Sequence, residues 1–306
     1  EEVPDFSRRA LLIFCADNGV VKEGVSQTGQ EVTAAVVSNM TRGRSCSCLM
    51  AEKAETDVFP IDIGIACEVE HQGKLHPLTE RKIRRGTSNF TKEAAMTRQE
   101  VLTAVLTGID AVRVLKDREY RLFTVGEMGI GNTTTSSAVA SVLLRKEPEL
   151  VTGCGAGLDL AGLKRKTKAI RRGIDLHQPD PMDGMDVLQK VGGFDLAAMA
   201  GAFLGGAIYH VPVVIDGVIA AAAAAAAGRI APAATDYMLA AHVSAEPASI
   251  WLLDLIGVTP AIRAGLRLGE GTGALALFPL LDMALSIYRD MDTFAEMEIE
   301  EYKPLV

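Results

Sequence analysis

The sequence predicts an α/β fold, a Rossmann-like parallel sheet flanked by helices, and two observations support this. Short β-type runs recur along the chain, each followed by a polar or glycine-rich corner and then by a longer stretch with helical spacing. That alternation is typical of parallel strands joined by crossover helices. The chain is also long enough, with 306 residues of which 48% are hydrophobic, to bury one large core.

We therefore expect a single domain over residues 1–306. The two ends, residues 1–9 and 278–306, are expected to pair into a small helical subdomain. The β-type runs that predict strands are, in chain order, residues 10–16, 58–65, 120–125, 211–215 and 237–243.

Helices are expected between these strands. Thr97 and Glu100 form a capping-box pattern ahead of an apolar stripe at helical spacing, which predicts a helix after residue 97. The alanine run 220–227 follows a strand and a turn and precedes Gly228, so a close-packed helix explains it better than disorder. The basic run 163–172 is typical of a solvated helix face, apart from Lys166.

The corners that follow the expected strands carry polar residues and glycines. In an open α/β sheet the carboxyl ends of the strands share one rim, and ligands bind there. The sequence therefore predicts the binding site at this rim, formed by Asp17-Asn-Gly19, Asp62-Ile-Gly64, Glu127-Met-Gly129, Asp216-Gly217 and Ser244-Ala-Glu246.

The composition argues against several classes of protein. A net charge of −8, with no long basic tract, argues against a nucleic-acid surface and favours small metabolites as partners. The five cysteines are an odd set without a Cys-x-x-Cys pair, which disfavours a disulfide framework and a thiolate zinc site. Apolar stretches are interrupted before reaching the ~18–20 residues that a membrane span requires. A cytoplasmic protein is expected.

Residues 124–135 resemble an anion-binding turn, because an apolar strand leads into glycines and hydroxyls and then into a small-residue helix. Glycine lets the backbone approach a phosphate, and the N–H groups of the first helical turn point toward it. The segment is neither a Walker loop nor the dinucleotide fingerprint. A phosphorylated small molecule fits it best, although a plain tight connection would share the pattern. The phosphate candidates are Gly129, Gly131, Asn132 and Thr133.

Three carboxylates stand in glycine-flanked corners, at Glu127, Asp216 and Glu270. Spacing leaves two alternatives open for Glu270, a cap for the helix that follows or a general base that a substrate can reach. The five histidines show no metal-ligand spacing, so neither a metal nor a cofactor is expected. A phosphate site with nearby carboxylates suits glycosyl transfer through an oxocarbenium-like centre.

Seven motifs follow one another along nearly the whole chain. They are Ala16-Asp-Asn-Gly-Val20, Glu23-Gly-Val-Ser26, Gly126-Glu-Met-Gly-Ile-Gly-Asn-Thr-Thr134, Gly153-Cys-Gly-Ala-Gly-Leu-Asp159, Val214-Ile-Asp-Gly217, Ser244-Ala-Glu-Pro247 and Leu266-Arg-Leu-Gly-Glu-Gly-Thr-Gly273. In this order they resemble the nicotinate-nucleotide–dimethylbenzimidazole phosphoribosyltransferase family. Two shorter segments, Arg85-Gly-Thr-Ser-Asn-Phe90 and Val191-Gly-Gly-Phe-Asp-Leu196, resemble family segments as well.

The resemblance implies that phosphoribosyl passes from nicotinate mononucleotide to a lower-ligand base, giving an α-linked ribotide and nicotinate for cobamide assembly. It also implies a homodimer. Glu270 corresponds to the general base, Lys166 suits the phosphate, and Leu268 would line the base pocket, with Ser26 and Gln30 as looser candidates there. The residues that resemble the family's donor-binding set are Glu127, Gly129, Lys166, Asp216, Gly217 and Ser244.

Two departures from the family pattern concern the acceptor. Asn18 stands where many relatives carry histidine, and the family's usual leading arm does not appear ahead of Asp5. A phenolic acceptor, and a heterodimer with a paralogous chain, therefore remain alternatives. A non-catalytic or partner-dependent nucleotide-binding subunit is the alternative from another class. A dehydrogenase is disfavoured, because no dinucleotide fingerprint follows the first expected strand.

Overall fold

A six-stranded parallel sheet forms the centre of the protein, described here by a computed structural model that covers residues 4–155, 157–300 and 302–303. The strand order is β3-β2-β1-β4-β5-β6, and every pairing is parallel. The predicted parallel α/β sheet is thus confirmed. The strands are β1 (Arg9–Ala16), β2 (Thr56–Gly64), β3 (Thr79–Glu80), β4 (Leu122–Met128), β5 (Val213–Ile215) and β6 (Met238–Ala240).

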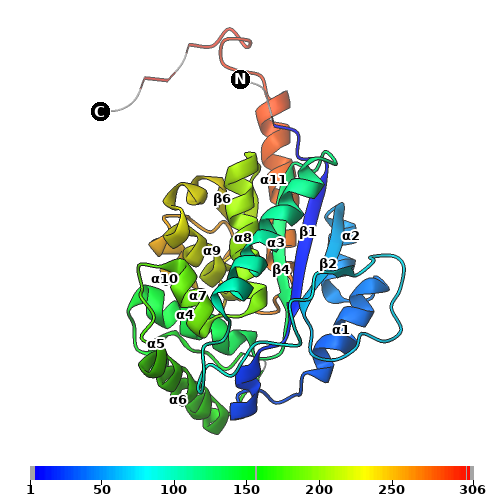
Figure 1. Cartoon of the computed structure of the whole chain (residues 1–306). Helices are drawn as coiled ribbons and strands as arrows, with labels where there is room; N and C mark the ends of the chain where they lie inside the picture. The colour runs from blue at the N-terminus through cyan, green and yellow to red at the C-terminus, as the bar shows by residue number, and fades with distance from the viewer. Residues whose placement is uncertain (1–3, 156, 301, 304–306) are drawn as a thin grey trace.

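Helices cover both faces of the sheet (Figure 1). One face packs against α3 (Arg98–Lys116), α8 (Phe194–Tyr209), α9 (Val218–Ile230) and their neighbours, and the other against α1 (Glu31–Thr41), α2 (Cys46–Lys53) and α11 (Thr272–Asp290). The remaining helices are η1 (Gly19–Glu23), α4 (Asn132–Leu144), α5 (Pro148–Val151), α6 (Leu160–His177), α7 (Gly184–Val191), η2 (Pro232–Tyr237) and α10 (Ser249–Leu255).

Strand β1 is buried along its whole length, and its side chains alternate between the two faces. Successive residues of a strand point to opposite faces, so a central strand with helices on both sides is apolar throughout. Ala10, Leu12 and Phe14 belong to the core with α3 and α8. Leu11 and Ile13 belong to the core with α1, α2 and α11.

The predicted helices form where the sequence places them. The Thr97 side chain accepts from the Glu100 N–H, and Glu100 accepts from the Thr97 N–H, so the capping box begins α3. The alanine run lies buried in α9 against α8 and α4, where small side chains permit close packing. α3 and α8 also cross closely, because a Cβ on Gly108 would lie 1.9 Å from the Ala198 carbonyl oxygen.

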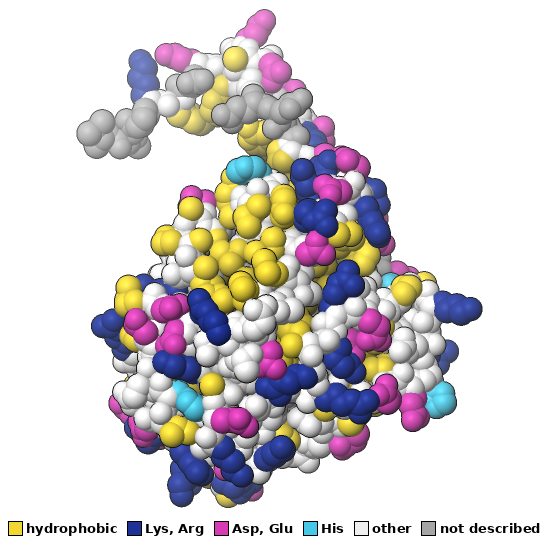
Figure 2. All heavy atoms as spheres, viewed as in Figure 1, with side chains coloured by type: hydrophobic (Ala, Val, Ile, Leu, Met, Phe, Trp, Pro, Cys, Tyr) yellow, Lys and Arg dark blue, Asp and Glu magenta, His cyan; other side chains and the backbone are white. Residues whose placement is uncertain are grey.

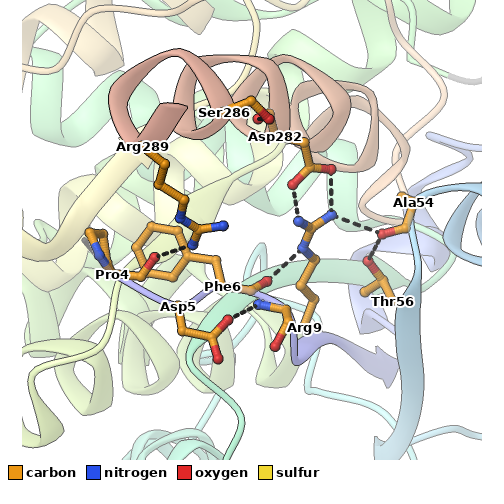
Figure 3. A network of polar contacts seen from close by, with 10 residues as sticks. Pro4, Asp5, Phe6, Arg9, Ala54, Thr56, Asp282, Ser286 and Arg289 are labelled. Atoms are coloured by element: carbon orange, nitrogen blue, oxygen red, sulfur yellow. Dashed lines mark hydrogen bonds and ion pairs between the residues drawn. The ribbon is translucent and has the colours of Figure 1, made fainter. Parts of the chain in front are cut away.

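The two ends of the chain lie side by side (Figure 3). Arg9 at the start of β1 donates to Asp282 in α11, with 3.0 Å from Nη1 to Oδ2, and Arg289 donates to the Pro4 carbonyl at 3.0 Å. The second half of α11 extends beyond the sheet in Figure 1. Residues 4–8 contain no helix. These contacts show that the two ends of the chain pack together. The single domain over residues 1–306 and its small helical subdomain stay predictions.

Acidic and basic side chains are interspersed over the lower half of the face that Figure 2 shows, while hydrophobic side chains gather above them. Leu102 and Leu106 of α3 and Ile208 of α8 are among the exposed apolar residues of the protein. In the part of the chain that the structure describes, no helix has the length and apolar character needed to cross a membrane.

Candidate active site

A cavity of about 310 Å³ opens at the carboxyl ends of β4 and β5, the edge of the sheet where the sequence predicts the site. It brings together residues from β4, the α4 turn, the corner after β5 and the loop before α11. The predicted residues that line it are Glu127, Gly129, Asn132, Thr133, Asp216, Gly217, Ser244, Leu268 and Glu270.

The predicted anion-binding turn forms one wall of this cavity. Helix α4 begins at Asn132 behind Gly131, whose φ of +97° suits a residue without a side chain. A Cβ on Gly129 would lie 1.8 Å from the Ala16 carbonyl oxygen, so this position also requires glycine. The N–H groups of Asn132, Thr134 and Thr135 donate to the Gly129 and Gly131 carbonyls. The start of α4 therefore presents the positive end of its dipole and the Thr133 hydroxyl at one end of the cavity.

Lys166 lies directly behind this turn and is fully buried. Its Nζ donates to Thr133 Oγ1 at 2.9 Å and to the Gly153 carbonyl at 3.2 Å. Burial lowers the pKa of the ammonium to about 8, although the charge of Glu246 opposes that shift. A cation thus stands behind the place where an anion would sit, although Lys166 itself does not line the cavity.

Glu127 connects the turn to the loop that carries Glu270. Its Oε2 accepts from the Asn132 side-chain amide, and its Oε1 accepts from the Glu270 N–H at 3.4 Å. Burial raises the pKa of Glu127 well above its ordinary value, and the charges of Asp195, Asp216 and Glu270 raise it further. The cavity therefore holds closely spaced acids that a positively charged reaction centre would stabilise.

Asp216 caps α11, a role that spacing left open for Glu270. Its Oδ1 accepts from the N–H groups of Gly273 at 2.7 Å and Ala274 at 3.0 Å, and its Oδ2 accepts from Gly271 at 3.2 Å. His242 Nε2 lies 3.7 Å from Asp216 Oδ1. Burial lowers the pKa of His242, but the Asp216 carboxylate outweighs burial, so the net pKa is raised. The Glu270 side chain is thereby left available to the cavity.

The backbone at Glu270 is held in an unusual conformation. Gly269, Glu270 and Gly271 have φ values of +89°, +58° and +80°, three successive left-handed residues. For a residue with a side chain this costs roughly 1–2 kcal/mol. Ser47 Oγ donates to Glu270 Oε2 at 3.0 Å. Burial raises the pKa of Glu270, the Ser47 hydrogen bond opposes that shift, and the charge of Asp216 adds to it.

Four predicted residues lie outside the lining. Gly131 packs beneath the turn, where a Cβ would lie 2.8 Å from Val21, and Lys166 is behind it. Gln30 donates from Nε2 to the Asn18 carbonyl at 3.3 Å, and the Ser26 hydroxyl accepts from the Thr28 N–H at 3.2 Å. Ser26 and Gln30 thus belong to the loop between η1 and α1, and their place in a base pocket stays a prediction.

Sequence reasoning missed several residues that line or support the cavity. Ser47 carries no local signal, because its partner Glu270 is 223 positions away along the chain. His242 offered a signal, since it is the penultimate residue of the predicted strand 237–243 and stands two residues before Ser244. Met128 and Glu246 also line the cavity and lie in two of the predicted rim corners. The other lining residues that sequence reasoning did not select are Ile130, Gly155, Val218, Ile219, Ala220, Arg267 and Gly269. Within the described ranges, no group of three or more His, Cys, Asp and Glu residues is placed to hold a metal.

The sequence profile of a family described as phosphoribosyltransferase matches residues 1–299, nearly the whole chain and all of the cavity. The chain belongs to this family. A phosphoribosyltransferase is an enzyme of the pentosyltransferase class. The predicted anion-binding turn and the carboxylates beside it lie in the matched part of the chain.

Individual relatives of the family match over a similar extent. Nicotinate-nucleotide–dimethylbenzimidazole phosphoribosyltransferase of Clostridium acetobutylicum is 45% identical over 305 residues, covering 100% of this chain and 86% of the relative. The protein of the same name from Escherichia coli strain SE11 is 40% identical, covering 97% of this chain and 82% of the relative. The crystal structure of CobT from Thermus thermophilus superposes with a TM-score of 0.92 at 38% identity, covering 98% of this chain and 89% of that one.

Proposed function

We propose that the chain transfers phosphoribosyl from nicotinate mononucleotide to 5,6-dimethylbenzimidazole or a related base or phenol. The products are an α-ribazole-type 5′-phosphate and nicotinate, as in cobalamin and cobamide biosynthesis. One observation carries the proposal: the start of α4 and the Glu270 carboxylate line the same cavity. Lys166 lies behind the start of α4, and Ser47 holds one of the two carboxylate oxygens of Glu270. Whole-chain similarity to enzymes named for this reaction supports it.

The proposed chemistry assigns one end of the cavity to each partner. The donor phosphate binds at the positive end of the α4 dipole and to the Thr133 hydroxyl, while Lys166 neutralises its charge. The bond between the ribose C1′ and the pyridine nitrogen breaks, and its electron pair leaves with nicotinate. Glu127, with the corner formed by Asp216, Gly217 and Ser244, faces the ribose, where negative charge stabilises an oxocarbenium-like centre.

Glu270 acts on the acceptor in this proposal. The acceptor nitrogen, or a phenol oxygen, forms the new bond to C1′ and gives up its proton to the Glu270 carboxylate. Attack on the face opposite the leaving nicotinate converts a β-linked donor into an α-linked product. Leu268, which lines the cavity and is 59% exposed, would contact the acceptor ring.

The test is chromatographic detection of nicotinate released from nicotinate mononucleotide. Parallel reactions contain dimethylbenzimidazole, adenine, p-cresol or no acceptor. Release that requires an acceptor supports the transferase and identifies the acceptor class. Donor binding without release in any of these reactions, by folded protein, would instead support the non-catalytic or partner-dependent subunit.

Small-molecule substrates are the partners that this proposal implies. Assembly as a homodimer, or as a heterodimer with a paralogue, stays a prediction, as does a cytoplasmic location.

We expect Arg267 to favour nicotinate mononucleotide over nicotinamide mononucleotide by pairing with the carboxylate of the nicotinate ring. It supplies the one Lys or Arg side chain in the described lining of the cavity, three residues before Glu270. Nicotinate mononucleotide carries a carboxylate that nicotinamide mononucleotide lacks. We expect Arg267→Gln to reduce the preference for the nicotinate donor about fivefold, equivalent to ~1 kcal/mol for an exposed ion pair.

The measurement is the ratio of kcat/KM for the two donors. Arg263→Gln is the matched control, because Arg263 is exposed on the same loop but does not line the cavity. An unchanged ratio in Arg267→Gln would refute this assignment.

A further inference from the structure

We propose that Ser47 is a positioning residue for Glu270: its hydroxyl fixes one carboxylate oxygen and leaves the other for the acceptor's proton. The inference rests on the proposed function, in which Glu270 is the general base. It assigns a part in the reaction to the first turn of α2, a segment that supplies no residue to the described lining of the cavity.

The contact between Ser47 and Glu270 is direct, and its Ser47 end is buried. Ser47 is fully buried, and its Oγ lies 3.0 Å from Glu270 Oε2. A carboxylate can only accept a hydrogen bond, so the Ser47 hydroxyl is the donor. Its oxygen then remains free to accept a hydrogen bond from another group.

Ser45 is placed to provide that second hydrogen bond. Its Oγ lies 2.8 Å from Ser47 Oγ and accepts from the Cys48 N–H at 3.2 Å, which caps α2. Capping fixes where the lone pairs of Ser45 point. The Ser45 proton can then be donated to Ser47, in preference to the weaker acceptor Cys48 Sγ at 3.1 Å. The result is a directed chain of hydroxyls from the helix cap to Glu270.

The other oxygen of Glu270 is left open. Among the described residues, Oε2 accepts the Ser47 Oγ hydrogen bond and no side chain donates to Oε1. The backbone N–H of Ser47 also interacts with the carboxylate and lowers its pKa. The Glu270 N–H meanwhile donates to Glu127, so the residue is held at its backbone and at one carboxylate oxygen. A proton acceptor fixed in this way avoids the cost of orienting its carboxylate in each turnover.

The surroundings of Glu270 explain why this hydrogen bond also affects its ionisation. Burial and Asp216, at the corner after β5, raise the pKa of Glu270, whereas the Ser47 hydrogen bond lowers it. Glu127 of β4 is a further acid nearby. Glu270 also acts electrostatically on the thiols of Cys48 and Cys15, and burial raises the pKa of each, so both remain uncharged. Ser47 is therefore the neutral donor that counteracts burial around the base.

The test compares the steady-state kinetics of Ser47→Ala and Ser47→Cys with those of the wild type. Cysteine keeps the side-chain shape but is a weak donor, so it separates packing from hydrogen bonding if the alanine variant folds poorly. We expect kcat at pH 7 to fall about tenfold, with KM little changed. The acid limb of the kcat profile should move up by roughly half a pH unit or more, because the carboxylate loses a donor to its charged form.

Ser141→Ala is the matched control. Ser141 is a buried serine that donates to the Lys146 carbonyl at 2.5 Å and does not line the active-site cavity. Its loss should affect stability while leaving the pH profile in place. A Ser47 variant that behaves like Ser141→Ala, destabilised but with an unshifted acid limb, would overturn the proposal.

A second readout does not require turnover. Protein labelled with glutamate carrying 13C at the carboxyl carbon allows the Glu270 titration to be followed by NMR, with Glu270→Gln used for assignment. The Glu270 pKa should rise in both Ser47 variants, and an unchanged titration would overturn the positioning role. If the wild type releases no nicotinate, the proposed function fails, while this titration still decides whether Ser47 acts on Glu270.

Discussion

Glu270→Gln is expected to lower kcat about 10²- to 10⁴-fold, the usual contribution of a general base. Glutamine keeps the size of the side chain, and its carbonyl oxygen can still accept from Ser47. It cannot take up the proton that the acceptor loses. Donor binding and the cap of α11 should remain, because Asp216, not Glu270, accepts from the first N–H groups of that helix.

The measurement is single-turnover nicotinate release together with calorimetric donor binding. The wild type should also lose activity as the pH falls through the pKa of Glu270. Burial raises that pKa, so the loss should begin at a higher pH than for an exposed glutamate. Unimpaired turnover by folded Glu270→Gln would mean that another group removes the proton.

Lys166→Met is expected to lower kcat/KM about 10- to 100-fold, mainly by raising KM for the donor, since a hydrogen bond to a charged group is removed. Lys166 supports Thr133 by donating to its hydroxyl at 2.9 Å. Its pKa of about 8 gives a second signature. Phosphate affinity of the wild type should decline as the pH rises through this value, because the ammonium loses its charge.

Inorganic phosphate is the probe for this prediction, and its stabilisation of the protein against heat is the readout. Lys168→Met serves as control, because Lys168 is exposed on the same helix, α6. Phosphate should raise the melting temperature of the wild type and of Lys168→Met more than that of Lys166→Met. Equal effects in all three proteins would place the phosphate elsewhere.

The fold was predictable to a large extent because its strands are buried and its helices carry local start signals. β1 is almost entirely apolar, and the capping box of α3 is formed by two residues only three positions apart, Thr97 and Glu100. β3 was missed for a physical reason. It has only two residues, both exposed, and is paired along one side with β2, so no periodicity marks it.

The site was predictable where it depends on the ends of strands. Glu127 and Asp216 meet because parallel strands end at one edge of the sheet. Which carboxylate would cap α11 was not predictable, since Asp216 is 55 positions or more from the N–H groups that it accepts from. The support of Glu270 by Ser47 likewise joins distant segments that pack only in the folded chain.

The left-handed segment of Gly269, Glu270 and Gly271 has an evolutionary consequence. Glycine adopts such a conformation without penalty, whereas glutamate there costs roughly 1–2 kcal/mol. A single-base change converts a glutamate codon into a glycine codon. Glu270→Gly would remove the proton acceptor and relieve the strain, while the cap on α11 depends on Asp216 and persists. A duplicated copy could thus lose its chemistry in one mutation and keep its fold, leaving an inactive paralogue available as a subunit.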